Sequence, residues 1–400
     1  MKTLPIVLNN KKILLIGNGV VAEHKASVLK RNEIEFKTVV TKFKITDLED
    51  YEIVVDATGS KEVSDLLIAY KKKFNLLLNV VDKPELCDFY FASLLEYGNF
   101  KVAVSSAGSS PTATQIIRDR IKKIMPKNIE EFCDKAMSDR KAGVIDLPET
   151  KKALAQVYLV GCGLGDVELL TIKAYNIIQR ADVVFIDHLI SQEIIEIIPS
   201  ECERVMVGKQ KGFHSIKQDE INKLLVEYAL KGKVIARLKS GDPYIFGRGS
   251  EEAIALVNEG IKVEVIPGIS SAIAGCATAG IAPTARGYAT NMSIVSAHFK
   301  GNSVNLEWVD LLKMPNHTTV VLMGVSRAKE ILSRATELEV QMSTKVAIIS
   351  NASRENQSTR VGTLKELVEL CSGVDRPAIL VFGEVVELQK ILPNMENNYE

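Results

Sequence analysis

The sequence has no net charge, no closely paired cysteines and no long apolar run. Its 50 basic and 50 acidic side chains cancel, which argues against bulk attraction to nucleic acid or to an anionic membrane. None of its six cysteines forms a Cys-x-x-Cys pair, so neither a metal cage nor a disulfide framework is expected. No stretch approaches the ~20 apolar residues that a membrane-spanning helix needs, and the N-terminus lacks a signal-peptide pattern. We therefore expect a cytoplasmic protein with reduced thiols and no nucleic-acid or membrane partner.

The length of 400 residues favours two or three domains, at about 150 residues per domain. In the first part of the chain, five apolar runs alternate with helical stretches, which predicts a Rossmann-like α/β domain with a parallel sheet. These runs are Lys12–Gly17, Phe36–Thr41, Glu52–Ala57, Leu76–Val81 and Val102–Ser105.

Beyond this domain the pattern predicts a helical connector and then a two-lobed α/β domain. The connector contains two expected helices, Thr114–Met125 and Ile129–Arg140, and a linker at Gly143–Thr150. Two series of strands follow, with runs at residues 157–161, 181–187, 204–208, 233–238 and 262–268, then at 293–298, 318–324, 345–350 and 377–383. The expected domains are residues 1–111, the connector 112–155 as a possible dimerisation segment, residues 156–390, and a tail at 391–400.

A glycine motif follows the first run and precedes a helix. Gly17-Asn18-Gly19-Val20-Val21-Ala22 reads G-x-G-x-x-A, in which Gly17 permits a tight turn and Gly19 lets backbone approach a diphosphate. Ala22 permits close packing, and the helix N-terminus at Val20 and Val21 presents free N–H groups to phosphate. The alternative is a tight turn that binds nothing. Where an acid would hold the adenosine ribose, the chain has Thr41 and Lys42, and Lys42 could favour a 2′-phosphate, so NAD and NADP both remain open.

Three segments, GNGVVAEHKA, NVVDKP and AVSSAGSSP, resemble the precorrin-2 dehydrogenase and sirohydrochlorin ferrochelatase module of the siroheme synthase family. The resemblance covers roughly residues 1–125 and implies NAD as cofactor and ferrous iron as a substrate. It makes Asp82 the residue that serves both reactions and transiently meets the metal, and it places Ser106 beside the site. Asp82 also follows an apolar strand, where open α/β sheets bind ligands and a carboxylate can accept a proton. The alternatives are a turn-forming Asp82 and a Ser106 that caps a helix.

This module departs from the family pattern in three respects. Ala107 stands where the family has glycine, the segment between the second and third expected strands is short, and the connector is shorter than in the long fused enzymes. These departures put the chelatase step in doubt more than nucleotide binding.

The second half carries several motifs in one order. They are the glycine loop Gly161–Asp166, Asp187 in VVFIDHLI, Lys209 in VMVGKQKGFH, the run RLKSGDPYIFGRGSEE at 237–252, and VIPGISS at 265–271. The set resembles uroporphyrinogen-III C-methyltransferase of the tetrapyrrole methylase family, over about residues 156–390. The resemblance implies two α/β lobes with S-adenosylmethionine in the cleft between them, held by glycine loops whose backbone can approach it closely.

Motif matching implies a set of contacts to this cofactor: Gly161, Gly163, Leu164, Gly165, Ser240, Gly241, Asp242, Ile245, Ser270, Ser271, Met323 and Ala352. Four of them replace a more usual residue. Leu164 replaces proline, Ser240 and Ala352 replace glycine, and Ser271 replaces alanine. Because backbone makes such contacts, we expect binding to tolerate these changes.

The resemblance also implies catalytic roles for Asp187 as general base and Lys209 as proton donor. Their alternatives are a strand-end cap and a solvated lysine. Uroporphyrinogen carries eight carboxylates, so a neutral chain must bind it with a local set of cations. The expected substrate-binding residues are His214, Arg237, Lys239, Arg248 and Arg286.

The expected function is siroheme biosynthesis: double methylation of uroporphyrinogen III to precorrin-2, NAD-dependent oxidation to sirohydrochlorin, and insertion of ferrous iron. The expected assembly is a homodimer. One alternative keeps only the methyltransferase, with the N-terminal domain serving dimerisation or nucleotide sensing. Another is a methylase that acts elsewhere in corrin synthesis.

Overall fold

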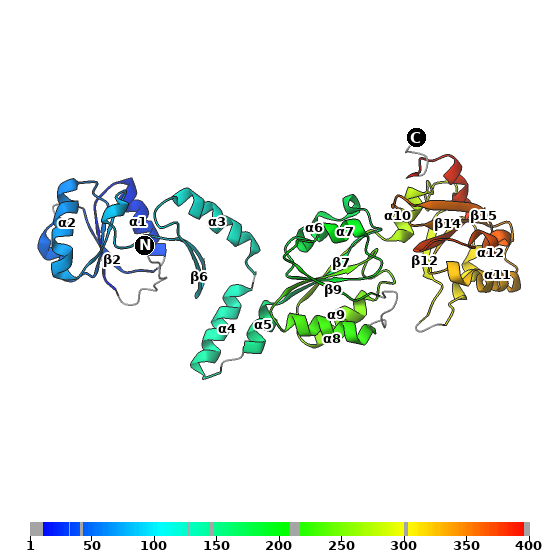
Figure 1. Cartoon of the computed structure of the whole chain (residues 1–400), viewed down its shortest axis with the longest axis horizontal. Coiled ribbons are helices and arrows are strands. Elements are labelled where there is room, and N and C mark those ends of the chain that lie inside the picture. The colour runs from blue at the N-terminus through cyan, green and yellow to red at the C-terminus, as the bar shows by residue number, and fades with distance from the viewer. Residues whose placement is uncertain are drawn as a thin grey trace. The chain divides into compact units, whose positions relative to one another are not determined.

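The computed structural model divides the chain into two compact units, Met1–Ile145 and Asp146–Glu400 (Figure 1). Both units combine helices with sheets, which confirms the predicted α/β class. The residues that the structure describes are 11–31, 33–40, 43–126, 128–144, 147–208, 217–299 and 303–395.

The first unit contains a parallel sheet with strand order β2-β1-β3-β4. Its strands are β1 (Ile13–Ile16), β2 (Phe36–Val39), β3 (Ile53–Asp56) and β4 (Leu77–Val80), connected by α1 (Val20–Arg31), α2 (Lys61–Phe74) and short 3₁₀ turns. The central strands β1 and β3 are buried along their whole length, with separate apolar clusters on the two faces. Burial on both faces explains why these runs are continuously apolar.

The fifth predicted strand, Val102–Ser105, does not join this sheet. It lies largely in β6 (Phe100–Val104), which pairs antiparallel with β5 (Ser93–Tyr97) in a separate hairpin. The expectation of a fifth parallel strand was wrong because only Gly98 and Asn99 connect the two runs. Two residues can close a hairpin, whereas a parallel neighbour needs a long crossover.

The connector forms helices α3 (Pro111–Ile124), α4 (Ile129–Lys141) and α5 (Leu147–Leu154). The first two confirm the predicted helices. The predicted linker Gly143–Thr150 was wrong in its second half, where α5 begins. A proline at position 148 is compatible with this helix because the first backbone N–H groups of a helix have no intrahelical acceptor.

The second unit begins with the first lobe, a parallel sheet of order β11-β7-β10-β8-β9 with helices on both faces. The five predicted strands are confirmed as β7 (Gln156–Gly161), β8 (Val183–Ile186), β9 (Glu203–Met206), β10 (Val234–Lys239) and β11 (Val263–Ile266). Helices α6 (Ile172–Ile178) and α7 (Gln192–Glu196) pack on one face. Helices α8 (Gln218–Ala229) and α9 (Gly249–Asn258) cover the other (Figure 1).

The second lobe is a mixed sheet of order β12-β13-β16-β14-β15, in which only β12 and β13 pair in parallel. Its strands are β12 (Asn291–Ser296), β13 (His317–Leu322), β14 (Lys345–Ser350), β15 (Ser358–Thr363) and β16 (Ala378–Phe382), and its helices are α10 (Ser271–Thr278), α11 (Ala328–Glu337) and α12 (Leu367–Leu370). Four of these strands were predicted. The edge strand β15 was missed because its sequence STRVGT is polar and only partly buried.

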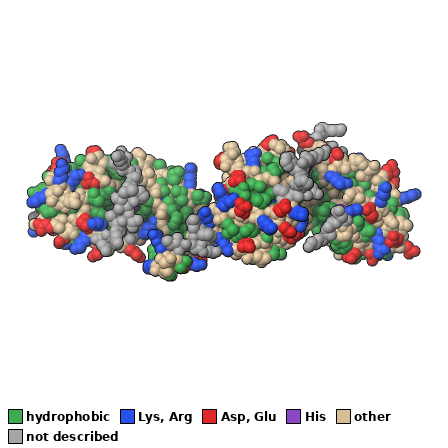
Figure 2. Space-filling view, turned by 60° about the horizontal axis from the view of Figure 1, so that its bottom comes forward, with side chains coloured by type: hydrophobic (Ala, Val, Ile, Leu, Met, Phe, Trp, Pro, Cys, Tyr) green, Lys and Arg blue, Asp and Glu red, His purple; other side chains and the backbone are tan. Residues whose placement is uncertain are grey.

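The face in Figure 2 shows no field of one charge among the described residues. On the face in Figure 2, Lys and Arg side chains lie among Asp and Glu side chains. Among the described helices, none is long and apolar enough to cross a bilayer. The six cysteines are all free thiols.

Candidate active site

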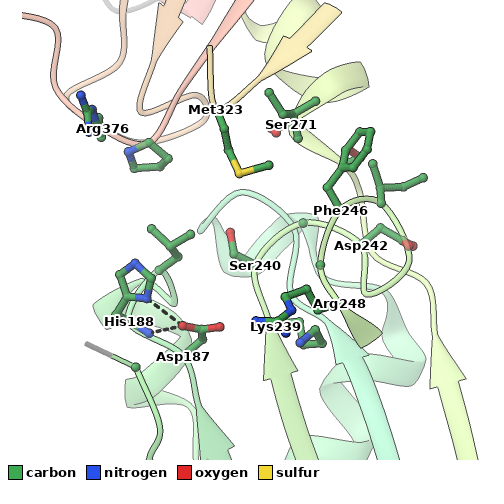
Figure 3. Close-up of a pocket in the computed structure, with 18 of the residues that line it drawn as sticks. Asp187, His188, Lys239, Ser240, Asp242, Phe246, Arg248, Ser271, Met323 and Arg376 are labelled. Atoms are coloured by element: carbon green, nitrogen blue, oxygen red, sulfur yellow. Dashed lines mark hydrogen bonds and ion pairs between the residues drawn. The ribbon is translucent and has the colours of Figure 1, made fainter. Parts of the chain in front are cut away.

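A cavity of about 1090 Å³ in the second unit is lined by both lobes. Asp187, Lys239 and Ser240 face it from the first lobe, while Met323 and Arg376 face it from the second (Figure 3). The first-lobe residues follow or end strands β8 and β10, so the cavity lies at the carboxyl edge of the parallel sheet. This is where open α/β sheets form ligand sites, and the volume suits a large organic ligand.

Three loops at this edge pack backbone against backbone. A Cβ atom on Gly161 would lie 2.4 Å from the backbone N of Gly268, and one on Gly268 would lie 2.2 Å from the carbonyl O of Gly241. Gly163 and Gly241 exchange two backbone hydrogen bonds, with N···O distances of 3.2 and 2.7 Å. These glycines therefore hold the loops after β7, β10 and β11 closer together than any side chain would allow.

The Asp242 carboxylate strengthens this junction. Its Oδ2 accepts a hydrogen bond from Gly268 N at 3.0 Å, and its Oδ1 accepts one from Tyr244 N at 2.8 Å. Both oxygens thus bind backbone of the site loops, which gives Asp242 a structural task besides lining the cavity.

Beneath the cavity lies a buried network of opposite charges. Arg237 and Lys239 lie on one face of β10, two residues apart, and both are almost fully buried. Glu252 of α9, with no exposed area, accepts hydrogen bonds from Arg237 Nε at 3.1 Å and from Lys239 Nζ at 2.9 Å. Gln218 Nε2 donates a further bond to Glu252 at 3.1 Å. The single negative charge of Glu252 therefore offsets part of the positive charge of the two buried cations.

The network reaches the cavity through Asp187. Arg237 Nη2 lies 3.3 Å from Asp187 Oδ2, while His188 donates its backbone N–H and its ring Nδ1–H to Asp187 Oδ1, both at 2.8 Å (Figure 3). Burial would raise the pKa of Asp187, but Arg237 and the hydrogen bonds from His188 outweigh it and lower the pKa below the ordinary 3.8. Asp187 is therefore an anion at neutral pH. Burial, together with Arg237, lowers the pKa of Lys239, against the opposing effect of Glu252.

The first unit presents its glycine turn to solvent at the start of α1. Gly17 has φ +130°, and a Cβ there would lie 2.6 Å from the carbonyl O of Ala57, so only glycine fits. Around Gly19 there is open space, and Val20 is 82% exposed, whereas Ala22 is buried against the sheet. Helix α1 begins at this turn, and the first backbone N–H groups of a helix have no acceptor within the helix, which is what a diphosphate site requires.

The other first-unit candidates lie in separate turns. Asp82, after β4, is exposed and has a left-handed φ of +62°. Ser106 Oγ accepts a hydrogen bond from Ser110 N at 2.9 Å, in the turn that leads into α3. Lys25 Nζ lies 4.4 Å from the centre of the Phe91 ring; burial lowers its pKa, while the Asp82 carboxylate raises it.

Comparison with known proteins agrees with this two-unit arrangement. Residues 156–368 match the family of tetrapyrrole (corrin/porphyrin) methylases, and residues 4–93 match an NAD(P)-binding family. Siroheme synthase 1 of Klebsiella pneumoniae is 33% identical over 98% of this chain and 96% of its own length. The chain belongs to the siroheme synthase family. The resemblance noted in the sequence is thereby confirmed.

Solved structures resemble the methylase half of this family member. The uroporphyrin III C-methyl transferase of Thermus thermophilus is 36% identical, with a TM-score of 0.52 over 58% of this chain and 99% of that one. Its complex with S-adenyl homocysteine is 35% identical, with a TM-score of 0.51 over 58% of this chain and 94% of that one.

In this siroheme synthase family member, most of the expected cofactor contacts line the one cavity. They are Gly163, Leu164, Ser240, Gly241, Asp242, Ile245, Ser270, Ser271, Met323 and Ala352. Gly161 and Gly165 lie on either side of Gly163 and Leu164 in the chain, but they are not among the residues that line the cavity. Asp187, Arg237, Lys239 and Arg248 also line the cavity, and Arg286 does not. Thr41, Lys42, Lys209 and His214 lie outside the described residues.

Sequence reasoning missed Glu252, His188 and Arg376. Glu252 stands in the quoted run 237–252, and helical spacing could have separated it from its exposed neighbour Glu251. His188 directly follows Asp187. Arg376 precedes β16, and no sequence signal marks it as a residue of the cavity.

The buried network yields a stability prediction. Glu252→Gln keeps the shape but leaves Arg237 and Lys239 without their shared anion, so the free energy of unfolding should fall by about 3 kcal/mol. Denaturant unfolding followed by circular dichroism measures this. Glu251→Gln is the matched control, because Glu251 pairs with Arg248 at the surface, where such pairs contribute little. Equal losses in the two variants would contradict the account.

The charge of Asp187 yields a pH prediction. Because its pKa is lowered in the folded protein, the stabilisation from its pairing is complete above the ordinary value of 3.8 and is lost as pH falls through the lower folded value. Carbon-detected NMR titration of the Asp187 carboxyl, assigned with Asp187→Asn, should give a pKa below 3.8. In Arg237→Met the pKa of Asp187 should rise, since the largest of the effects that oppose burial is then removed. A native carboxyl that titrates above 3.8 would refute this.

Proposed function

We propose that this chain is a siroheme synthase: it methylates uroporphyrinogen III twice to precorrin-2, oxidises precorrin-2 to sirohydrochlorin with NAD, and inserts ferrous iron. The observation that carries the proposal is the cavity between the lobes, where glycine loops and an ionised Asp187 meet. The same chain carries an NAD(P)-binding unit, which a dehydrogenase requires.

The cavity fits S-adenosylmethionine, which supplies an electrophilic methyl group on a positively charged sulfur. Gly163 and Gly241 expose backbone to the cavity from the first lobe, and Met323 and Ala352 line it from the second. These groups would hold the cofactor, which supplies the methyl group, and positioning of the two reactants supplies much of the rate. Asp187 stabilises the positive charge that methylation leaves on the ring and accepts the proton that is released.

The substrate carboxylates need cations that are not held in buried ion pairs. Arg237 and Lys239 are buried and paired with Glu252 and Asp187, so we assign them to positioning Asp187 rather than to binding substrate. Arg248 lies exposed at the cavity, where its pair with Glu251 is open to solvent, and Arg376 reaches the cavity from the second lobe. We assign these two to the substrate carboxylates, because guanidinium groups bind carboxylates with two hydrogen bonds.

In the first unit, the turn Gly17–Ala22 would hold the diphosphate of NAD. Asp82 is the proposed proton acceptor in dehydrogenation. We propose ferrous iron as a substrate whose ligands are the tetrapyrrole nitrogens, with Asp82 accepting the protons that these nitrogens release.

We also propose a homodimer and a cytoplasmic location. Ile116, Ile117 and Ile124 of α3 are exposed, and a second copy would cover them. Six free thiols suit a reducing compartment.

The methyltransferase-only alternative is not favoured, because the relative aligns with nearly the whole chain, including the NAD(P)-binding unit. The other alternative, a methylase that acts elsewhere in corrin synthesis, predicts that the protein does not turn over uroporphyrinogen III.

The mass of the product tests the methylation step. Purified protein given uroporphyrinogen III and S-adenosylmethionine should form a product heavier by two methyl groups. Arg376→Gln should raise KM for the tetrapyrrole about tenfold and leave KM for S-adenosylmethionine near the native value, since a charged hydrogen bond to substrate is lost. No turnover of uroporphyrinogen III would reject the proposed substrate.

A second test separates the two units. Asp82→Asn should abolish formation of sirohydrochlorin from precorrin-2 and leave methylation intact. Asparagine is the chosen replacement because it adopts the left-handed conformation of Asp82 more readily than alanine does. Glu85→Gln, an exposed carboxylate in the same loop, is the control and should retain both activities. Loss of both activities in a folded Asp82→Asn protein would contradict the two-site model.

A further inference from the structure

The loop after β14 contains a serine in an unfavourable backbone conformation. Ser353 has φ of +62°, a region that residues other than glycine, asparagine and aspartate seldom occupy, and Asn351 in the same loop has φ of +48°. The loop is anchored to the second lobe: Asn351 N donates to Pro377 O at 2.9 Å, and Gln357 Nε2 donates to Thr278 O at 3.1 Å. Strain that persists in an anchored loop points to a task for what the loop presents.

The loop presents Arg354 to the first lobe. Arg354 Nε donates to the carbonyl O of Leu164 at 3.1 Å, and Nη2 donates to the carbonyl O of Leu189 at 3.0 Å. The side chain is partly buried, and burial lowers its pKa, while the Glu193 carboxylate raises it. A planar guanidinium can bind two carbonyls in fixed directions at once, which a lysine ammonium cannot do with the same rigidity.

The two carbonyls belong to the two loops that build the first-lobe side of the cavity. Leu164 lies in the glycine loop after β7, and Leu189 is two residues beyond Asp187; both line the cavity. Ser191 Oγ donates to Gly165 O at 2.5 Å and so ties these loops to each other. Arg354 connects both of these loops to the second lobe. The glycine loop, the turn after Asp187 and the loop after β14 are therefore joined by hydrogen bonds.

We infer that Arg354 is a positioning residue for methyl transfer, which sets the second lobe at a fixed distance from the cofactor loop and the Asp187 turn. The inference rests on the proposed function for what these two loops do. Arg354 is not assigned a contact with any ligand; it acts through Leu164 and Leu189.

Arg360 offers a matched control. Its Nη1 donates to two carbonyls, Leu370 O at 3.0 Å and Ser372 O at 2.6 Å, both within the second lobe. Arg354→Gln and Arg360→Gln therefore each remove an arginine that binds two backbone carbonyls, but only the first removes hydrogen bonds between the lobes.

The experiment measures S-adenosylhomocysteine binding by calorimetry and steady-state methylation of uroporphyrinogen III. Arg354→Gln should weaken binding about tenfold and lower kcat by a similar factor, whereas Arg360→Gln should stay within about twofold of the native protein. Arg354→Lys keeps the charge and can reach one carbonyl, so its binding should be intermediate; it also serves if Arg354→Gln does not fold. Unfolding midpoints of all variants separate a loss of stability from a loss of positioning.

Two outcomes are distinguishable. Native binding and turnover with Arg354 variants that match Arg360→Gln would overturn the inference alone. A native protein that binds no S-adenosylhomocysteine would overturn the proposed function and this inference with it.

Discussion

The packing of the first lobe depends on one buried carboxylate, Glu252, which balances two buried cations. Strand β10 ends with Arg237 and Lys239 on the face that α8 and α9 cover, and burying two cations without an anion would cost several kcal/mol each. Glu252 meets both, and Arg237 carries the arrangement on to Asp187. Because the charges fix one another, the carboxylate that faces the cavity stays ionised and oriented.

The second constraint is the close approach of Gly161, Gly241 and Gly268, which brings three loops to one point at the edge of the sheet. Those loops line the cavity with backbone rather than with side chains, as a ligand with many polar groups requires. From the second lobe, Arg354 binds the carbonyls of Leu164 and Leu189. Charge balance, glycine packing and this joint together determine the geometry available for methyl transfer.

Much of this arrangement could be predicted from the sequence, because buried parallel strands leave continuous apolar runs and glycine loops leave recognisable spacing. The exceptions have physical causes. Strand β15 is polar, the run Val102–Ser105 pairs through a two-residue turn, and α5 begins in a segment that read as a linker. Arg237 and Lys239 were expected to bind substrate, but a sequence does not show that Glu252 lies between them. Arg354 and Arg376 come from loops whose positions depend on how the lobes pack.

The central claim is that one chain carries two chemically separate sites that act in sequence on one tetrapyrrole. An absorbance time course with uroporphyrinogen III tests it most directly, with S-adenosylmethionine, NAD and ferrous iron added in that order. The account predicts three successive spectral changes, each dependent on its own addition: precorrin-2, then sirohydrochlorin, then siroheme. A course that stops at precorrin-2 when NAD and iron are supplied would contradict it.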